Sequence, residues 1–145
     1  MSTQAFTREQ RVRFGHCDPA GIVFFPQYLV MLNELVEDWF AHGLNLPFTQ
    51  FMGERRLGLP TVRLEVDFTA ISRMGDLLVQ RLQVLKAGSR SLTLNIEFSG
   101  ADGLRLRARQ ILVCTSMDDH RPRAWPAELV AALPRFMAVN DKELA

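Results

Sequence analysis

The sequence has few of the features that mark secreted, membrane-spanning or nucleic-acid-binding proteins. It holds two cysteines, Cys17 and Cys114, too few for a disulfide framework, which favours a reducing cytoplasm. No apolar run approaches the roughly 18 residues of a membrane span, and residues 1–13 lack the apolar core of a signal peptide. Seventeen basic residues balance sixteen acidic ones. A net charge of +1 gives no overall attraction to nucleic acid or to an anionic membrane.

Several familiar motifs are also missing. The sequence contains no P-loop, no GxGxxG fingerprint and no GxSxG elbow, so nucleotide hydrolysis, dinucleotide binding and serine-hydrolase chemistry have no support, and no cofactor is expected. No repeat or linker-like composition interrupts the chain. Because 48% of the residues are apolar, residues 1–145 are long enough and apolar enough for one domain with its own core.

An apolar stripe predicts one long helix between Pro26 and Gly43. Proline suits the first helical turn, and glycine is typical just after the last one. The stripe recurs at helical spacing and consists of Tyr28, Leu32, Leu35, Val36, Trp39 and Phe40.

Strand-like segments lie on both sides of this helix. Residues 3–14 read as a first strand, and alternating apolar and polar residues predict strands at 62–68 and 92–98. The run at 77–87 follows a turn at Met74-Gly75-Asp76, and a return strand is predicted at 104–115 after the hairpin turn at residues 100–103. The alternation slips between Ala108 and Ile111, which indicates a bulge or burial on both faces. Pro126 then opens a short amphipathic helix whose apolar residues are Leu129, Val130, Leu133 and Phe136.

This order of elements predicts an α+β domain. We expect a curled antiparallel sheet of about five strands wrapped around one long helix, with a short C-terminal helix. The turn after the first strand then lies at the N-terminus of the long helix. Candidate functional residues are therefore sought in that turn.

The turn carries a dense motif. Two phenylalanines, Pro26 and Tyr28 follow a segment that reads Gly15-His16-Cys17-Asp18-Pro19-Ala20-Gly21-Ile22-Val23. This motif resembles the signature of the 4-hydroxybenzoyl-CoA thioesterase family of hotdog-fold enzymes. The element order also resembles the hotdog fold over nearly the whole chain.

The resemblance implies hydrolysis of a small acyl-CoA, with an aromatic acyl group as one option. It assigns Asp18 as the nucleophile or general base, and the backbone N–H of Phe25 as the oxyanion site. Helix N-termini present unpaired N–H donors and a positive dipole end, which would stabilise charge on the thioester oxygen. Phe25 stands where some family members carry Tyr or His, and His16 where some carry an acidic residue, so the acyl group stays open.

The resemblance also suggests residues that contact the substrate. Phe24 and Tyr28 are candidates for an apolar acyl pocket, and His16 for tuning Asp18. Thr61 is expected to line the thioester site, and Arg90 to contact the CoA phosphates across a subunit interface. A homodimer or homotetramer is implied, because hotdog sites form between subunits.

Other interpretations of these residues remain open. Asp18 before proline is also typical of an Asx turn. Cys17 is a possible nucleophile by position, although a buried apolar cysteine is the simpler interpretation. A metal site is not expected, because His16, Cys17 and Asp18 lack the usual ligand spacing.

Two other functions fit the same fold. A hydratase or dehydratase of acyl thioesters would need a histidine paired with a carboxylate, and His16 is the local candidate. A non-catalytic acyl-CoA-binding protein would have no use for Asp18, because an idle buried carboxylate is costly.

Overall fold

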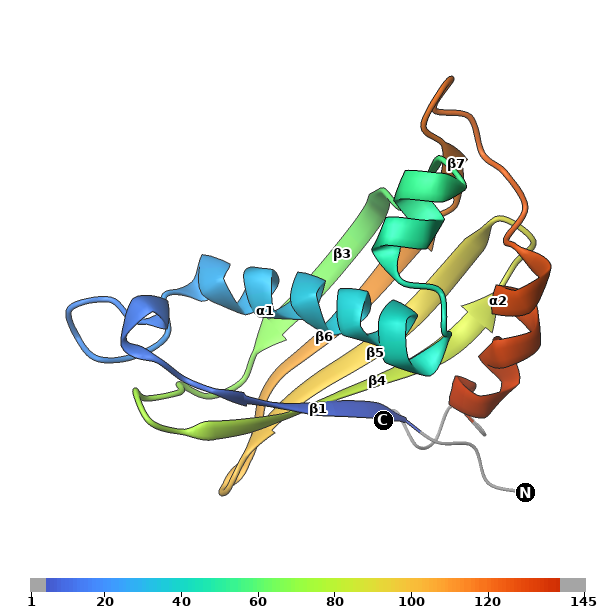
Figure 1. Cartoon of the computed structure of the whole chain (residues 1–145). Helices are drawn as coiled ribbons and strands as arrows, with labels where there is room; N and C mark the ends of the chain where they lie inside the picture. The colour runs from blue at the N-terminus through green and yellow to red at the C-terminus, as the bar shows by residue number, and fades with distance from the viewer. Residues whose placement is uncertain (1–4, 139–145) are drawn as a thin grey trace.

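The computed structural model describes residues 5–138 as an antiparallel sheet with one long helix against it (Figure 1). The sheet has five strands in the order β1-β4-β5-β6-β3. Their bounds are β1 Phe6–Arg11, β3 Thr61–Phe68, β4 Leu77–Ala87, β5 Ser91–Gly100 and β6 Gly103–Val113. A small two-stranded sheet pairs β2 (Leu57–Gly58) with β7 (Thr115–Ser116).

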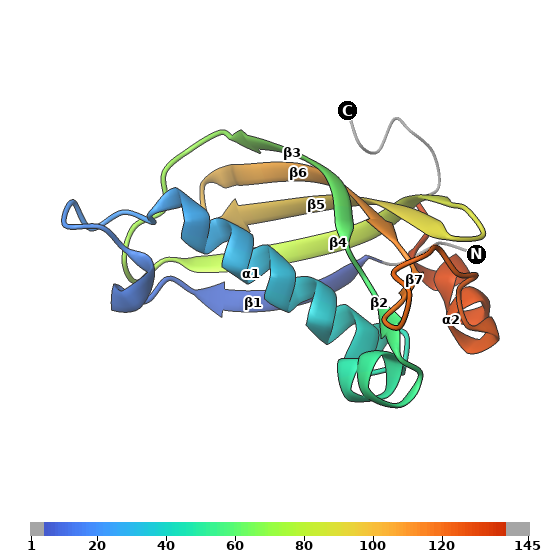
Figure 2. The same cartoon turned by 90° about the horizontal axis from the view of Figure 1, so that it is seen from above.

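Helix α1 (Phe25–Asp38) crosses one face of the sheet (Figure 2). Its buried side chains are Tyr28, Met31, Leu32, Leu35 and Val36, which are the apolar residues of the predicted stripe and its neighbours. The helix continues into a π-helical turn, η2 (Trp39–Gly43), and a second one, η3 (Thr49–Glu54), follows. Gly43 ends the helical run against the Trp39 ring, where a Cβ would collide with the indole.

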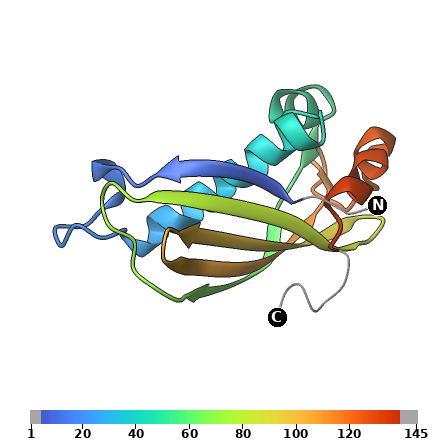
Figure 3. The same ribbon diagram turned by 90° about the horizontal axis from the view of Figure 1, so that it is seen from below.

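The sheet directs alternate side chains toward α1. Leu94, Ile96 and Phe98 of β5 are fully buried on that face, and Leu106 and Ala108 of β6 lie beside them in register. Among residues 5–138, no helix covers the other face of the central strands, as the view from below shows (Figure 3). The curled sheet, the long helix and the short C-terminal helix confirm the predicted α+β hotdog arrangement.

The first strand is shorter than predicted. Residues 3–14 were expected to be extended, but β1 ends at Arg11 and a 3-10 turn, η1 (Phe14–His16), begins three residues later. The amide of His16 donates to the Arg13 carbonyl at 3.0 Å, which closes this turn. Residues 3 and 4 lie outside the described residues. The chain therefore bends before the motif instead of reaching it as a strand.

The slip between Ala108 and Ile111, expected to mark a bulge or burial on both faces, is not a bulge in β6. The register shift lies in the neighbouring β3, between Thr61 and Arg63, which align with Leu112 and Ile111. Opposite β5, the register runs without a shift from Leu106 to Val113. The alternation looked broken because a polar residue, Gln110, occupies a buried position on the face that carries Leu106 and Ala108. Its Nε2 donates to the Thr61 hydroxyl at 2.9 Å.

The C-terminal helix is confirmed as α2 (Ala127–Ala132), followed by a 3-10 turn, η4 (Leu133–Phe136). Leu129, Leu133 and Phe136 are buried as expected, but Val130 is half exposed, so it is wrongly included in the apolar face. Within the described residues, no helix combines the length and the apolar character that a membrane crossing would need.

Candidate active site

The predicted motif lies in a small three-stranded arrangement at one end of the molecule. Cys17 pairs with Val23, and Ile22 pairs with Arg73 from the connection between β3 and β4. The Asp18 amide donates to the Ile22 carbonyl at 3.0 Å. The motif turn and the β3–β4 connection therefore lie together beside the start of α1, at the left of Figure 1.

Asp18 sits in a tight Asx turn. Its Oδ1 accepts a hydrogen bond from the Ala20 amide at 2.9 Å, and its carbonyl accepts one from Gly21 at 2.9 Å. Gly21 closes the turn at φ +80°, a conformation that suits glycine. Among the described residues no group donates to Oδ2. The carboxylate is thus positioned by one oxygen, and the other is available to a ligand.

The first amide of α1 is an unpaired donor beside this turn. Phe24 caps the helix without a side-chain hydrogen bond, its own amide donates to the His16 carbonyl at 3.0 Å, and Pro26 follows in the first turn. Within residues 5–138 no acceptor pairs with the Phe25 N–H. This is the donor that the resemblance assigned to the oxyanion site.

His16 holds the turn together. Its Nδ1 accepts a hydrogen bond from the Arg13 amide at 2.9 Å, and its carbonyl accepts the Phe24 amide. With Nδ1 used as an acceptor, the neutral ring carries its proton on Nε2. His16 therefore links the end of β1 to the start of α1, and one of its two ring nitrogens is already hydrogen-bonded within the turn.

Cys17 is poorly suited to nucleophilic attack. Burial raises the pKa of its thiol, and the neighbouring Asp18 carboxylate raises it further. The thiol donates to the Arg13 carbonyl at 3.5 Å. Because the thiolate is the reactive form, these effects act against Cys17 as the nucleophile.

An apolar cavity of about 340 Å³ opens beside the helix N-terminus. Its walls come from the start of α1 and from the β3–β4 connection, and the residues are Val23, Phe25, Tyr28, Phe68, Thr69, Ala70 and Ile71. The Phe25 ring meets the Phe68 ring edge-on, with centroids 6.1 Å apart. The cavity is of the size and character of small-molecule sites.

Tyr28 supplies a buried polar group to this cavity wall. Its hydroxyl lies 2.8 Å from the Ser72 hydroxyl, and both residues are buried. The Phe24 ring packs on Phe25 at 5.6 Å but does not line the cavity. Sequence reasoning missed the wall from Phe68 to Ile71 and the buried Ser72 behind it. The apolar Phe68 and Ile71 around the end of a strand were the available signal.

Two predicted substrate residues lie at the opposite end of the sheet. Thr61 begins β3, whereas Phe68 at its far end contacts the cavity. Thr61 aligns with Leu112, and Leu112 with Leu92, so the β4–β5 turn that holds Arg90 is at the Thr61 end. Within one chain, neither Thr61 nor Arg90 comes to Asp18.

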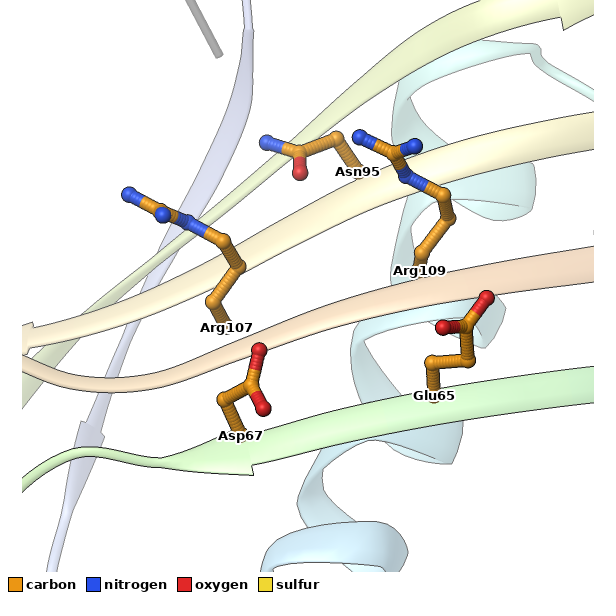
Figure 4. A pocket seen from close by; sticks show the side chains of 5 residues that line it. All are labelled: Glu65, Asp67, Asn95, Arg107 and Arg109. Carbon is orange, nitrogen blue, oxygen red and sulfur yellow. The ribbon is translucent and has the colours of Figure 1, made fainter. Parts of the chain in front are cut away.

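A second pocket, of about 130 Å³, lies on the face of the sheet away from α1. Figure 4 shows Glu65 and Asp67 of β3, Asn95 of β5, and Arg107 and Arg109 of β6 around it. Two carboxylates thus stand beside two guanidinium groups, and Arg107 is bonded to Glu97 at 3.1 Å. The balanced charges are typical of a solvated sheet face. Within residues 5–138, no cluster of three or more His, Cys, Asp or Glu side chains is arranged to hold a metal ion.

Comparisons with known protein sequences point to one family. Residues 12–133 match the family model of the thioesterase-like superfamily. A 4-hydroxybenzoyl-CoA thioesterase from Pseudomonas sp. strain CBS-3 is 32% identical over 127 residues, which cover 83% of this chain and 90% of the relative. A 1,4-dihydroxy-2-naphthoyl-CoA hydrolase from Synechocystis sp. is 29% identical over 126 residues, covering 83% and 91%.

Solved structures agree. The crystal structure of a 1,4-dihydroxy-2-naphthoyl-CoA thioesterase from Synechocystis superposes with a TM-score of 0.81 and 28% identity, covering 90% of this chain and 96% of that one. An Asp-to-Asn mutant of 4-hydroxybenzoyl-CoA thioesterase in complex with 4-hydroxybenzoyl-CoA superposes with a TM-score of 0.79 and 28% identity. The match covers 90% of this chain and 99% of that one.

Proposed function

Since the chain belongs to the thioesterase-like superfamily and is a thioester hydrolase, we propose that it hydrolyses a small aromatic acyl-CoA to the free acid and CoA. One observation carries this proposal: the free carboxylate oxygen of Asp18, the unpaired Phe25 N–H and an apolar cavity all lie at one end of α1. These are the nucleophile or base, the oxyanion donor and the acyl site that thioester hydrolysis requires.

Asp18 is proposed to start the reaction in one of two ways. As a nucleophile, its oxygen bonds to the thioester carbon, the C–S bond breaks, CoA thiolate leaves, and water then hydrolyses the mixed anhydride. As a general base, it takes a proton from water, the hydroxide attacks the same carbon, and the proton passes to the departing sulfur. After a single turnover in ¹⁸O-water, label in the Asp18 carboxylate identifies the nucleophilic route with water attacking the aspartyl carbonyl, because the general-base route places ¹⁸O in the product acid alone.

The Phe25 amide is proposed to stabilise the oxyanion. Negative charge develops on the thioester oxygen in both routes, and a fixed N–H at a helix N-terminus favours it. Removal of one such donor typically costs on the order of 100–1,000-fold in rate. The relative solved with its substrate bound carries an Asp-to-Asn substitution, which supports a carboxylate as the acting group.

The cavity favours an aromatic acyl group. Phe25 and Phe68 present a ring face and a ring edge, an arrangement that suits further aromatic contacts. The relatives named above act on hydroxybenzoyl-CoA and dihydroxynaphthoyl-CoA. Tyr28 contributes to the cavity wall while its hydroxyl is bonded to Ser72, and the Phe24 ring packs on Phe25 outside the cavity.

A homodimer across β3 is proposed to complete the site. β3 is an edge strand, and the side chains of Val62, Leu64 and Phe68 are all exposed. A bare apolar edge is a template for pairing with a second copy. Antiparallel pairing about a two-fold axis would bring Thr61 and Arg90 of the partner subunit toward the end that holds Asp18.

This assembly is tested by sedimentation. We expect a dimer or a larger even assembly for the unaltered protein, and a monomer with little thioesterase activity for the double variant Val62→Lys/Leu64→Lys. A monomeric and fully active unaltered protein would contradict the shared site. We also propose that residues 1–145 act as one such domain, and the two free cysteines support a cytoplasmic location.

The central experiment measures thiol release from aromatic and short aliphatic acyl-CoAs. We expect turnover of aromatic substrates and a loss of at least 100-fold in kcat for Asp18→Asn, on the scale of other catalytic groups. Asp118→Asn, on an exposed residue at the other end of the molecule, is the matched control. Tight binding without turnover, unchanged in Asp18→Asn, would instead support a non-catalytic binder, and water addition to an enoyl-CoA would support a hydratase.

A further inference from the structure

Three exposed arginines gather around Gly75, on the outside of the motif turn. The guanidinium of Arg11 donates to the Gly75 carbonyl at 2.8 Å. The Gly75 amide donates to the carbonyl of Val12 at 2.8 Å, so Arg13 is next to Gly75, and Arg73 precedes it by two residues. We refer to Arg11, Arg13 and Arg73 as the loop arginines.

Asp18 and Arg73 share one face of the small arrangement of strands. Asp18 stands opposite Ile22, and Ile22 stands opposite Arg73. Opposite residues point to the same side and have Cβ atoms about 5 Å apart, so two steps place Arg73 roughly 10 Å from Asp18. The next row contains Val23 and Ser72, which are buried. The row of Asp18 is therefore the outer one.

The charges of the loop arginines are not taken up by direct ion pairs among the described residues, although Arg73 acts electrostatically on Asp76. Within residues 5–138 none of them forms an ion pair with a carboxylate. Asp76, the acid next to Gly75, is bonded to Arg105 at 2.8 Å. By contrast, Arg107 in the pocket on the other face is paired with Glu97. Exposed guanidinium groups without carboxylate partners are suited to bind phosphate.

An exposed aromatic ring lies beside them. Phe14 follows Arg13 in the turn η1, and its exposed fraction of 82% is the highest among the large apolar side chains described. A bare ring next to arginines is the combination with which proteins bind nucleotides, by stacking of the base and by pairing of the phosphates. Phe14 is thus a second, independent sign of a ligand.

We propose that the loop arginines bind the phosphate groups of the acyl-CoA and that Phe14 stacks on its adenine. This inference rests on the proposed function, because it takes the thioester to be at Asp18. The pantetheine arm would then run outward over Ile22 to the loop arginines of the same subunit. The competing position for the phosphates is Arg90 of the partner subunit.

Three thioesters with the same acyl group test this proposal. Acyl-CoA carries phosphates and adenine, acyl-4′-phosphopantetheine carries one phosphate and no adenine, and acyl-pantetheine carries neither. We expect Arg13→Ala/Arg73→Ala to lower kcat/KM on the order of tenfold or more for the first two, through KM, and to leave acyl-pantetheine unchanged. Phe14→Ala is expected to cost on the order of tenfold with acyl-CoA alone.

The control is Arg81→Ala, which removes an exposed arginine in the middle of β4. An equal loss with all three thioesters would mean a general structural defect and would overturn the proposal. The proposal would be overturned if Arg90→Ala, but not Arg13→Ala/Arg73→Ala, lost the preference for thioesters that carry phosphate. The partner's Arg90 would then be the phosphate-binding residue. If the natural substrate is an acyl carrier protein, which carries phosphopantetheine without adenine, Arg13→Ala/Arg73→Ala would lower kcat/KM and Phe14→Ala would not. That result would support the phosphate role of the loop arginines and overturn the stacking of Phe14 on adenine.

Calorimetry keeps this proposal separate from the proposed function. The Kd of CoA itself is measured for the unaltered protein and for Arg13→Ala/Arg73→Ala, with pantetheine as the ligand that lacks phosphates. A weakening on the order of tenfold for CoA alone supports the loop arginines even where no thioester is hydrolysed. Equal affinity of both proteins for CoA overturns the inference, whatever the hydrolysis assay gives.

Discussion

The guanidinium of Arg105 donates to the Asp76 carboxylate at 2.8 Å and, through the same nitrogen, to the Ile71 carbonyl at 3.0 Å. One side chain on β6 thereby holds both ends of the segment from Ile71 to Asp76, and Ile71 lines the acyl cavity. Its other nitrogens donate to Asp102 in the β5–β6 turn. The side chain of Arg105 is only 7% exposed, so these bonds are made in a largely dry environment.

Replacing Arg105 is expected to destabilise the protein. Arg105→Met leaves the Ile71 carbonyl without its partner, and we expect the free energy of unfolding to fall by about 1–3 kcal/mol. A fully buried pair would cost more, but the Asp76 and Asp102 carboxylates remain partly hydrated. Urea unfolding measures this, with Arg81→Met, at an exposed position of β4, as the control. Equal midpoints for the two variants would contradict it.

Stability is expected to decrease in acid through Asp76. The backbone N–H of Arg73 and then the Arg105 guanidinium hold the pKa of this carboxyl below its usual value. A lowered folded-state pKa contributes stability above the unfolded pKa of about 3.9, and this is lost as the pH falls through the folded value. We therefore expect Asp76→Asn to be less stable than the unaltered protein at pH 7 and nearly equal at pH 2–3. A difference that stays constant with pH would contradict this.

The bond between Tyr28 and Ser72 is expected to couple the helix to the cavity wall. Tyr28→Phe leaves a buried serine hydroxyl unpaired and should cost about 1–3 kcal/mol, as should Ser72→Ala. The double variant is expected to cost less than the sum, with a coupling of about 1 kcal/mol. A double-mutant cycle from urea unfolding gives this number directly, and strict additivity would show that the hydrogen bond contributes nothing.

The two thiols are expected to differ in reactivity and to report on Asp18. Burial raises the pKa of Cys114 to about 11, so it should stay unmodified in the folded protein. Cys17 is less buried, and its raised pKa comes from burial and then from Asp18. We expect Asp18→Asn to lower that pKa and to speed alkylation of Cys17 at pH 8. Mass spectrometry identifies the modified cysteine, and an unchanged rate would mean that the carboxylate does not act on the thiol.

The sequence predicted the elements well where one physical rule decides them. β4 matches residues 77–87, a run that begins directly after the Met74-Gly75-Asp76 turn. The alternation of apolar and polar residues failed at Gln110, because a polar residue is expected to be exposed. Gln110 is buried because its amide donates to Thr61 on the neighbouring strand. The strand before the motif ended early for a local reason, the hydrogen bond from the Arg13 amide to the His16 ring.

The candidate site was predictable only where it is contiguous in sequence. Asp18, Phe25 and Tyr28 fall in one motif, and the structure brings them to one end of α1. Phe68 and Ser72 were missed because nothing local relates them to residue 18, which only the pairing of Ile22 with Arg73 brings near. Thr61 and Arg90 lie at the far end of the sheet, so their proposed role depends on a second subunit.

Tyr28 is the single tyrosine of the chain, and it lies in the wall of the acyl cavity. Both tryptophans lie elsewhere: Trp39 is in η2, and Trp125 precedes α2. Biosynthetic labelling with fluorotyrosine would therefore place one ¹⁹F nucleus in the protein, at the proposed acyl site. Titration with an acyl-CoA analogue would then be followed as the movement of a single resonance, free of assignment and overlap.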